Sequence, residues 1–266
     1  MKKKILWLVP AAIAIIVWLT IEISKQDITP ETKTVTSPDF ASILDGTEKK
    51  ETFFNYLVPF VVEKNRRILE DRQELTRIID NSTPPNKEEK RWLGALRGIF
   101  KLKKVGVYTP DTLEQLYLHL DVIPESLVLA QAANESAWGT SRFAVKGNNY
   151  FGQWCFRKGC GLVPEFREDE AAHEVRRFKD ARESVFAYID NLNSNRAYRS
   201  LRNTRAELRK KKEDITGLKL VGGVSSYSQR GKEYVKEIAT LIRYNKLWRF
   251  NTDYSSLISN ESEIKK

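Results

Sequence analysis

Apolar residues that recur every three or four positions are the feature that most limits the folds open to this chain. Between residues 54 and 79 they share one face of a helix: Phe54, Leu57, Val58, Val61, Ile68, Leu75 and Ile79. Pro59 predicts a kink or a restart in this helix, which Pro84 and Pro85 end near Asp80. Similar spacing predicts helices over 88–102, after Asp111, after Pro124, over 185–192 and over 235–242. We therefore predict a mainly α fold.

The helical pattern fails between Phe151 and Phe178, where turn residues appear. The stretches 165–167 and 175–178 flank a polar turn and predict a small β-hairpin lobe. The two cysteines of the chain, Cys155 and Cys160, lie just before it. In an oxidising compartment they would close a small disulfide loop, and otherwise they are two reduced thiols in a loop.

The N-terminus predicts a membrane anchor. A triplet of lysines at 2–4 precedes the uncharged run 5–21, which reaches roughly 26 Å as a helix at about 1.5 Å per residue. A bilayer core is about 30 Å thick, and no small-residue cleavage site follows the run. We therefore expect residues 1–23 to be an uncleaved transmembrane helix, with its lysines in the cytoplasm and the rest of the chain outside.

The composition of the remaining chain suggests three segments. Residues 24–46 are polar and contain prolines, which is typical of a linker. Residues 47–250 carry the helical patterns and would form the folded domain, including accessory N-terminal helices. Residues 251–266 resemble a frayed tail.

The charge balance indicates an acidic partner. The chain has 45 Lys and Arg against 35 Asp and Glu, a formal net charge of +10. For an exported domain this favours the cell wall or an anionic membrane surface, and it argues against nucleic acid. With two histidines and two cysteines in the whole chain, we expect no metal site and no cofactor.

The most informative segment runs from Pro124 to Trp154, and within it Glu135 carries the chemical prediction. Val128, Gln131 and Glu135 fall on one side of a helix, and Glu135 lies one turn before Gly139, a residue that commonly ends helices. The negative end of a helix dipole and apolar neighbours both raise a carboxyl pKa. A general acid that protonates a glycosidic oxygen needs such a pKa, although a solvated glutamate at a helix end is an equally simple interpretation.

The residues around Glu135 resemble a known family. The segments Asn134–Phe143 and Gly147–Gly152, with the motifs Ser-Ala-Trp-Gly-Thr-Ser and Asn-Asn-Tyr-Phe-Gly, are similar to the glucosaminidase domain of glycoside hydrolase family 73. Residues 53–59 and the charged helix after them resemble its Bax-like branch in Gram-negative bacteria, which is unrelated to the apoptosis factor. The resemblance covers roughly residues 48–250. It implies a lysozyme-like helical fold and hydrolysis of the β-1,4 bond after N-acetylglucosamine in peptidoglycan.

The resemblance also implies roles for particular residues. Glu135 matches the essential general acid, and Tyr227 matches a tyrosine near the scissile bond. The expected sugar-binding residues are Trp138, Asn149, Tyr150, Phe151 and Trp154. Phe151 is equally suited to the core, and Asn149 to shaping the turn.

The second carboxylate of the family lies on the mobile β-hairpin, where this chain offers several acids. We favour Glu165, with Glu168 as the second choice, and leave open whether the reaction retains or inverts the anomeric configuration. Two other functions remain open: a lytic transglycosylase, and a wall-binding module without turnover. The expected location is the inner membrane, with a single span and the catalytic domain in the periplasm.

Overall fold

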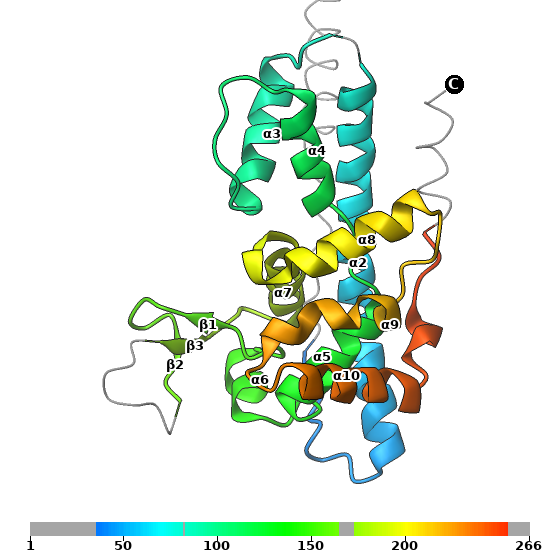
Figure 1. The fold of residues 1–266 in the computed structure, drawn as a ribbon. Coiled ribbons are helices and arrows are strands. Elements are labelled where there is room, and N and C mark those ends of the chain that lie inside the picture. The colour runs from blue at the N-terminus through cyan, green and yellow to red at the C-terminus, as the bar shows by residue number, and fades with distance from the viewer. Residues whose placement is uncertain (1–35, 82, 165–172, 255–266) are drawn as a thin grey trace, which may run out of the picture. The chain divides into compact units, whose positions relative to one another are not determined.

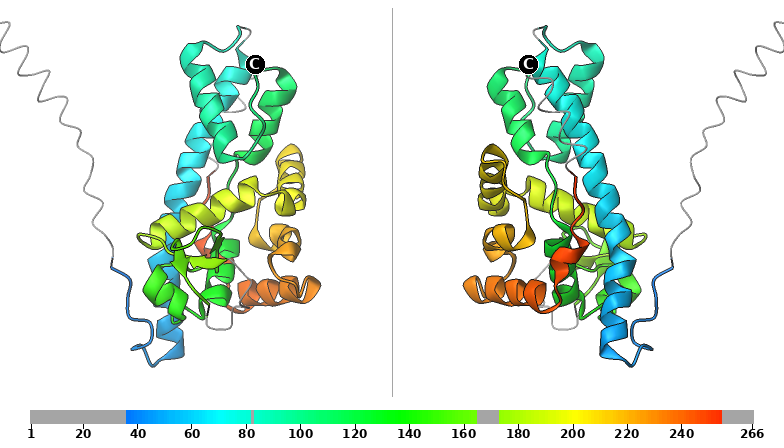
Figure 2. Two further views of the ribbon diagram at one scale, coloured as in Figure 1. Left: turned by 90° about the vertical axis from the view of Figure 1, so that its left-hand side faces the viewer. Right: turned by 90° about the vertical axis from the view of Figure 1, so that its right-hand side faces the viewer.

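The structure is a computed structural model that describes residues 36–81, 83–164 and 173–254. From Ser37 onward these residues form one compact unit. Figure 1 shows it as a set of helices with a small sheet at one side, and Figure 2 shows two further views. The predicted mainly α fold with a small β lobe is confirmed, and this arrangement fits a lysozyme-like domain.

The long helix α2 (Gly46–Asp80) spans the length of this unit (Figure 2). Asp45 caps its start by accepting hydrogen bonds from the backbone N–H groups of Thr47 and Glu48. The helix continues as one element through Pro59, so the prediction of a restart there was wrong. Buried apolar residues line the helix on both sides of Pro59, and this packing outweighs the backbone hydrogen bond that proline cannot make.

Two shorter helices, α3 (Lys87–Ile99) and α4 (Pro110–His119), lie beside the C-terminal half of α2 (Figure 1). Both begin with a capping box, at Asn86 and at Thr109. α3 ends three residues before the predicted boundary at Leu102.

The centre of the unit is α5 (Glu125–Ser136), which is buried along almost its whole length. α2, α9, α10 and η3 all pack against it. The other helical elements are α6 (Arg142–Gly147), α7 (Ala181–Ser194), η1 (Arg196–Tyr198), α8 (Arg199–Lys210), α9 (Gly217–Leu220), η2 (Val221–Tyr227), α10 (Lys232–Tyr244) and η3 (Leu247–Phe250). The helix that carries the predicted acid Glu135 is therefore anchored in the core.

The β lobe differs from the predicted hairpin. It is a three-stranded antiparallel sheet of order β1-β3-β2, made of β1 (Trp154–Cys155), β2 (Gly161–Leu162) and β3 (Glu174–Arg176). The predicted second strand overlaps β3, which ends at Arg176, whereas the predicted first strand at 165–167 lies outside the described residues. Gly161 is required here because a Cβ atom would lie 2.0 Å from the carbonyl oxygen of Val175.

The folded unit extends beyond the predicted boundaries at residues 47 and 250. Phe40, inside the predicted linker, is buried against Phe53 and Tyr56 of α2. Residues 251–254, assigned to the tail, are hydrogen-bonded to the first turn of α5: Asn251 accepts from the N–H of Ser126 at 3.0 Å. The two ends therefore contribute to the packing around α5.

No helix within the described ranges is both long and apolar enough to cross a bilayer. The predicted anchor at 1–23 lies outside those ranges.

A buried ionic cluster fixes the chain just ahead of α5. Asp121 is 3% exposed and pairs with Arg209 of α8 through Oδ1 at 2.6 Å and Oδ2 at 3.1 Å. Arg205 of α8 and Arg72 of α2 lie 3.6 and 3.8 Å from its Oδ2. Burial alone would raise the pKa of Asp121, but the three guanidinium groups hold it well below its usual range. The cluster therefore ties α2, α8 and the start of α5 together.

Candidate active site

Glu135 is the penultimate residue of α5 and stands at the edge of the core, where its side chain is half-buried. Its Oε2 atom is 3.7 Å from the position that a Cβ atom on Gly152 would take. The Asn-Asn-Tyr-Phe-Gly segment therefore approaches the carboxylate at its final glycine. A Cβ atom at position 152 would touch the carboxylate at ordinary van der Waals distance, and the φ of 64° there favours glycine.

A left-handed turn follows Glu135. Ala137, Trp138 and Gly139 have φ angles of 49°, 59° and 81°, so the helix is ended by Ala137 rather than by the glycine that the sequence indicated. Left-handed backbone at two residues that carry a Cβ is strained, and such strain persists where the surroundings impose it. Here Ser136 imposes it, because its Oγ accepts from the N–H of Gly139 at 2.9 Å.

Three residues behind Glu135 form a directed hydrogen-bond chain. Tyr188 donates its hydroxyl proton to Oε1 of Gln131, and Gln131 donates from Nε2 to the hydroxyl oxygen of Tyr234 at 2.8 Å. Tyr234 in turn donates to Oε1 of Glu135 at 2.8 Å. Since an amide Nε2 only donates, the proton of Tyr234 is directed to the carboxylate. The chain holds Glu135 in one orientation.

The pKa of Glu135 is raised above its ordinary value, chiefly because burial disfavours the charged carboxylate. The hydrogen bonds from Tyr234 and Asn134 and the charge of Arg230 oppose this shift but do not cancel it. The end of the helix dipole acts in the same direction as burial. The carboxyl group of Glu135 therefore keeps its proton up to a higher pH than an exposed glutamate does.

Tyrosine rings enclose this carboxyl group. Tyr227 stacks on Tyr234 with ring centroids 5.8 Å apart and packs edge-on against Tyr188 at 6.1 Å. Its hydroxyl donates to the carbonyl oxygen of Phe151 at 2.6 Å. Burial raises the pKa values of Tyr227 and Tyr234, followed by Tyr188 and then Glu135 for Tyr227 and by the charge of Glu135 for Tyr234, so both hydroxyls keep their protons. The structure thus brings Tyr227 into the cluster around the acid, with its hydroxyl bonded to the backbone.

The Asn-Asn-Tyr-Phe-Gly segment is mostly internal. The side chain of Asn149 is buried and holds the turn: its amide donates to the carbonyl oxygens of Gln153 and Arg176. The hydroxyl of Tyr150 is 2.8 Å from Oγ of Ser37 inside the core, and Phe151 stacks on Tyr188 with centroids 4.0 Å apart. Rings that are 1% exposed offer no face to a sugar, so these side chains shape the site in this conformation.

The two predicted tryptophans differ in environment. Trp138 is half-buried against Phe53 and Phe54 of α2, at centroid distances of 5.9 and 5.5 Å. Trp154, two residues beyond Gly152, is 58% exposed and stacks one face on His173. Trp154 is therefore the predicted aromatic residue with the most exposed ring, and it lies two residues after the glycine that approaches Glu135.

The described residues do not include either favoured second carboxylate. Glu165 and Glu168 belong to residues 165–172, between β2 and β3. Glu174, another acid of that region, is buried, and its oxygens accept from the N–H groups of Gly159 and Gly161 at 2.9 and 2.8 Å. That carboxylate supports the loop between β1 and β2.

The same loop contains the predicted cysteine pair, which the structure joins in a disulfide between Cys155 and Cys160. Their sulfur atoms and the carboxylate of Glu174 lie within 4.8 Å of one another. Because the sulfurs are bonded to each other and the carboxylate is engaged by backbone N–H groups, this group does not provide metal ligands.

Comparison with known proteins identifies the family. The model of the family called Glucosaminidase, described as mannosyl-glycoprotein endo-beta-N-acetylglucosaminidase, matches residues 111–247. The chain is also 32% identical over 213 residues to Protein bax of Escherichia coli strain K12, which covers 79% of this chain and 75% of that protein. The chain belongs to the glucosaminidase family. This membership supports a glycoside hydrolase that acts on peptidoglycan. No solved structure matches the chain.

Sequence reasoning missed two residues of the candidate site, Tyr188 and Tyr234. The sequence did indicate Gln131, which connects the two tyrosines, because Gln131 lies four residues before Glu135 and therefore one turn away on the same helix face. Tyr234 lies in α10, which begins after the turn that follows Tyr227, and only the fold brings it to Glu135.

Proposed function

We propose that this protein cleaves the β-1,4 glycosidic bond after N-acetylglucosamine in peptidoglycan, with Glu135 as the general acid. The observation that carries the proposal is the environment of Glu135: a half-buried carboxyl group with a raised pKa, held by Tyr234. A protonated carboxyl group in this setting can donate to the leaving glycosidic oxygen as the bond breaks. Family membership supports the substrate class.

The reaction needs a second group to assist attack on the oxocarbenium-like centre. We propose Glu165, with Glu168 as the alternative, because both belong to the segment that joins β2 to β3. A carboxylate that activates water is expected roughly 6.5–9.5 Å from Glu135, and a nucleophile about 5–5.5 Å from it. The acetamido group of the substrate is a third candidate. Inversion would indicate a carboxylate that activates water, whereas retention would indicate a nucleophilic carboxylate or the acetamido group.

The experiment is mass spectrometry of peptidoglycan that has been digested by the full-length chain in detergent and reduced with borohydride. We expect new reducible ends on N-acetylglucosamine, absent with Glu135→Gln. Glu165→Gln should lose most activity, whereas Glu170→Gln in the same segment serves as the matched control. Anhydro-muramyl ends would instead identify a lytic transglycosylase. Binding to sacculi without release of products would identify a wall-binding module.

We further propose that residues 1–23 anchor the protein in the inner membrane, with the catalytic domain in the periplasm. The support is the lysine triplet followed by the uncharged run at 5–21. Deleting residues 1–23 should move the protein from the membrane fraction to the soluble fraction. A deletion variant that remains in the membrane fraction would contradict the proposal.

A further inference from the structure

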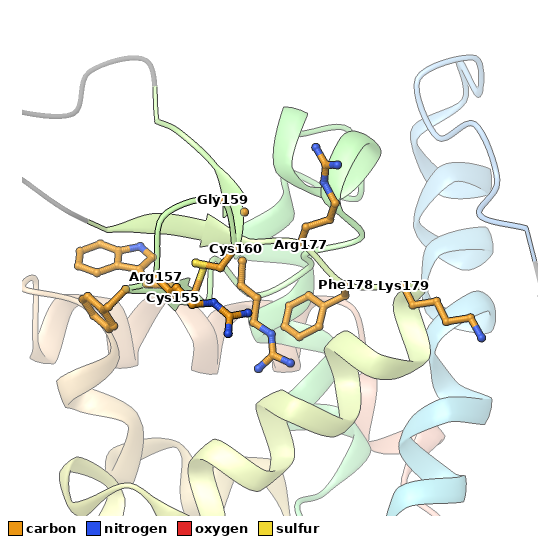
Figure 3. Close-up of a pocket in the computed structure, with 11 residues that line it drawn as sticks. Cys155, Arg157, Gly159, Cys160, Arg177, Phe178 and Lys179 are labelled. Carbon is orange, nitrogen blue, oxygen red and sulfur yellow. A yellow bond between two sulfur atoms is a disulfide. The ribbon is translucent and has the colours of Figure 1, made fainter.

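A basic cavity opens in the β lobe. It has a volume of about 730 Å³ and is lined by the disulfide loop and by β3 and the residues after it (Figure 3). The lining side chains include four cations and three aromatic rings: Arg157, Arg176, Arg177, Lys179, Trp154, Phe156 and Phe178. A cavity of this size accommodates a short peptide or a sugar.

The chain leads from the surroundings of Glu135 to this cavity within two residues. Gly152 adjoins the carboxylate, and Trp154, which lines the cavity, follows two residues later. Two residues of extended chain span at most about 7 Å. A polymer whose scissile bond lies at Glu135 would therefore have this cavity within its reach.

The loop that carries Arg157 is rigidly supported. The disulfide between Cys155 and Cys160 closes it, and Glu174 of β3 accepts hydrogen bonds from the N–H groups of Gly159 and Gly161. A cation held on such a loop loses little entropy when it binds an anion. The loop is therefore built to present Arg157.

The cations divide into an inner pair and an outer pair. In Figure 3 the side chain of Arg157 extends under the disulfide, whereas those of Arg177 and Lys179 point away from it. The guanidinium of Arg176 lies 4.6 Å from the ring of Phe178, which also lines the cavity. Arg176 also makes a 3.3 Å ion pair with Glu183, in which both side chains are 44% exposed. Arg157, which extends under the disulfide, and Arg176, which lies over the ring of Phe178, form the inner pair.

The aromatic residues suit a carbohydrate at the same place. Trp154 stacks one face on His173 and is 58% exposed, and Phe156 is 76% exposed. Sugar rings pack against such faces, while guanidinium groups bind carboxylates through paired hydrogen bonds. A ligand that combines a sugar with carboxylates matches the whole lining.

We propose that this cavity binds the carboxylates of the peptide stem of peptidoglycan, through Arg157 and Arg176, and so directs cleavage to glycan that carries stems. The proposal rests on the proposed function, since it takes peptidoglycan as the substrate. In peptidoglycan the stems branch from the sugar next to N-acetylglucosamine, so a stem lies beside the scissile bond. The cations would hold the stem while Trp154 supports the glycan.

The test compares two soluble ligands: a disaccharide-tetrapeptide muropeptide, and the same muropeptide with its stem carboxylates converted to amides. Binding is measured by calorimetry with full-length protein in detergent, in a Glu135→Gln background that prevents turnover. We expect the amidated ligand to bind about fivefold more weakly, as two partly exposed guanidinium contacts predict. The difference should shrink at high salt.

Variants locate the effect. In the Arg157→Gln, Arg176→Gln double variant the two ligands should bind equally, and Arg157→Gln alone should lose part of the difference. The single variant keeps the ion pair between Arg176 and Glu183 intact. The matched control is Arg91→Gln with Lys103→Gln, which removes the same charge near α3 and should keep the fivefold difference.

Two results would overturn the inference: equal binding of both ligands to the parent protein, or a difference that survives in the double variant. Failure of the proposed function looks different. In that case the protein with Glu135 intact releases no sugar from peptidoglycan, while the preference for the charged ligand is retained. If sugar is released but both ligands bind equally, the proposed function stands and the stem-binding site does not.

Discussion

Replacing Asp121 by asparagine tests whether the buried ionic cluster holds the start of α5. The change keeps the shape of the side chain and the hydrogen bond to the N–H of Val122, which is 2.8 Å from Oδ1. It removes the charge that faces Arg72, Arg205 and Arg209. Three guanidinium groups would then remain buried around a neutral amide.

Breaking a buried ion pair by neutralising one partner costs about 3–5 kcal/mol, because the remaining charge is left without compensation. Asp121 is 3% exposed, and Arg205 is 1% exposed, so water replaces little of the lost interaction. The free energy of unfolding of an ordinary domain is about 5–15 kcal/mol, so this loss would be a large share of the total stability.

The assay is urea unfolding followed by circular dichroism, with the free energy of unfolding taken by linear extrapolation. The matched control is Glu63→Gln, whose ion pair with Arg182 is 2.6 Å long but partly exposed, and which should cost less than about 1 kcal/mol. A loss below about 1 kcal/mol for Asp121→Asn would refute the reasoning.

The pH dependence of stability is a second test of the charge on Asp121. Because the pKa of Asp121 is lower in the folded state, its contribution to stability is fully present above its unfolded pKa, near 3.9. That contribution is lost as the pH falls through the folded pKa. Below pH 4, therefore, the unfolding free energy of the parent protein should fall more steeply than that of Asp121→Asn.

Three further predictions concern the site. Tyr234→Phe removes the hydrogen bond that stabilises the carboxylate of Glu135, so the pKa of Glu135 should rise further. The alkaline limb of the pH profile of kcat/KM should then move to higher pH. An unchanged limb would count against Glu135 as the acid. Gly139→Ala should lower the free energy of unfolding by about 1–3 kcal/mol in thermal unfolding. The reason is that φ is 81° and the new Cβ atom would lie 2.3 Å from a ring carbon of Phe40. No loss of stability would show that the turn adapts. Reduction of the disulfide formed by Cys155 should increase amide hydrogen exchange in the loop between β1 and β2 without unfolding the core; unchanged exchange would show that other contacts hold the loop.

Local rules were sufficient for much of the fold. The apolar spacing identified the long helix before Asp80 and the helices at 185–192 and 235–242, because each buries one face. The spacing of Cys155 and Cys160 predicted that a disulfide between them could close a small loop, and the structure contains this disulfide. Of the two outcomes predicted at Pro59, a kink or a restart, the restart was wrong, because tertiary packing overrides the cost of one missing backbone hydrogen bond.

The small sheet is a second feature that local sequence patterns could not predict. Three strands of two or three residues carry too few side chains to give an alternating pattern, so the pairing of β3 with β1 and β2 could not be seen in the sequence. Their register depends on the close approach of Gly161 to Val175, which is a contact between backbones.

By itself the sequence determined that Glu135 stands at the end of a helix, because helix periodicity and the residues that end helices act over a few positions. It also determined the chain's basic character. Only the tertiary structure decided which groups surround the acid: Tyr234 is 99 positions away, and Tyr188 reaches it through Gln131. The same holds for the arginines around Asp121, up to 88 positions away. Burial and charge pairing depend on distances in space, and these exist only once the helices have packed.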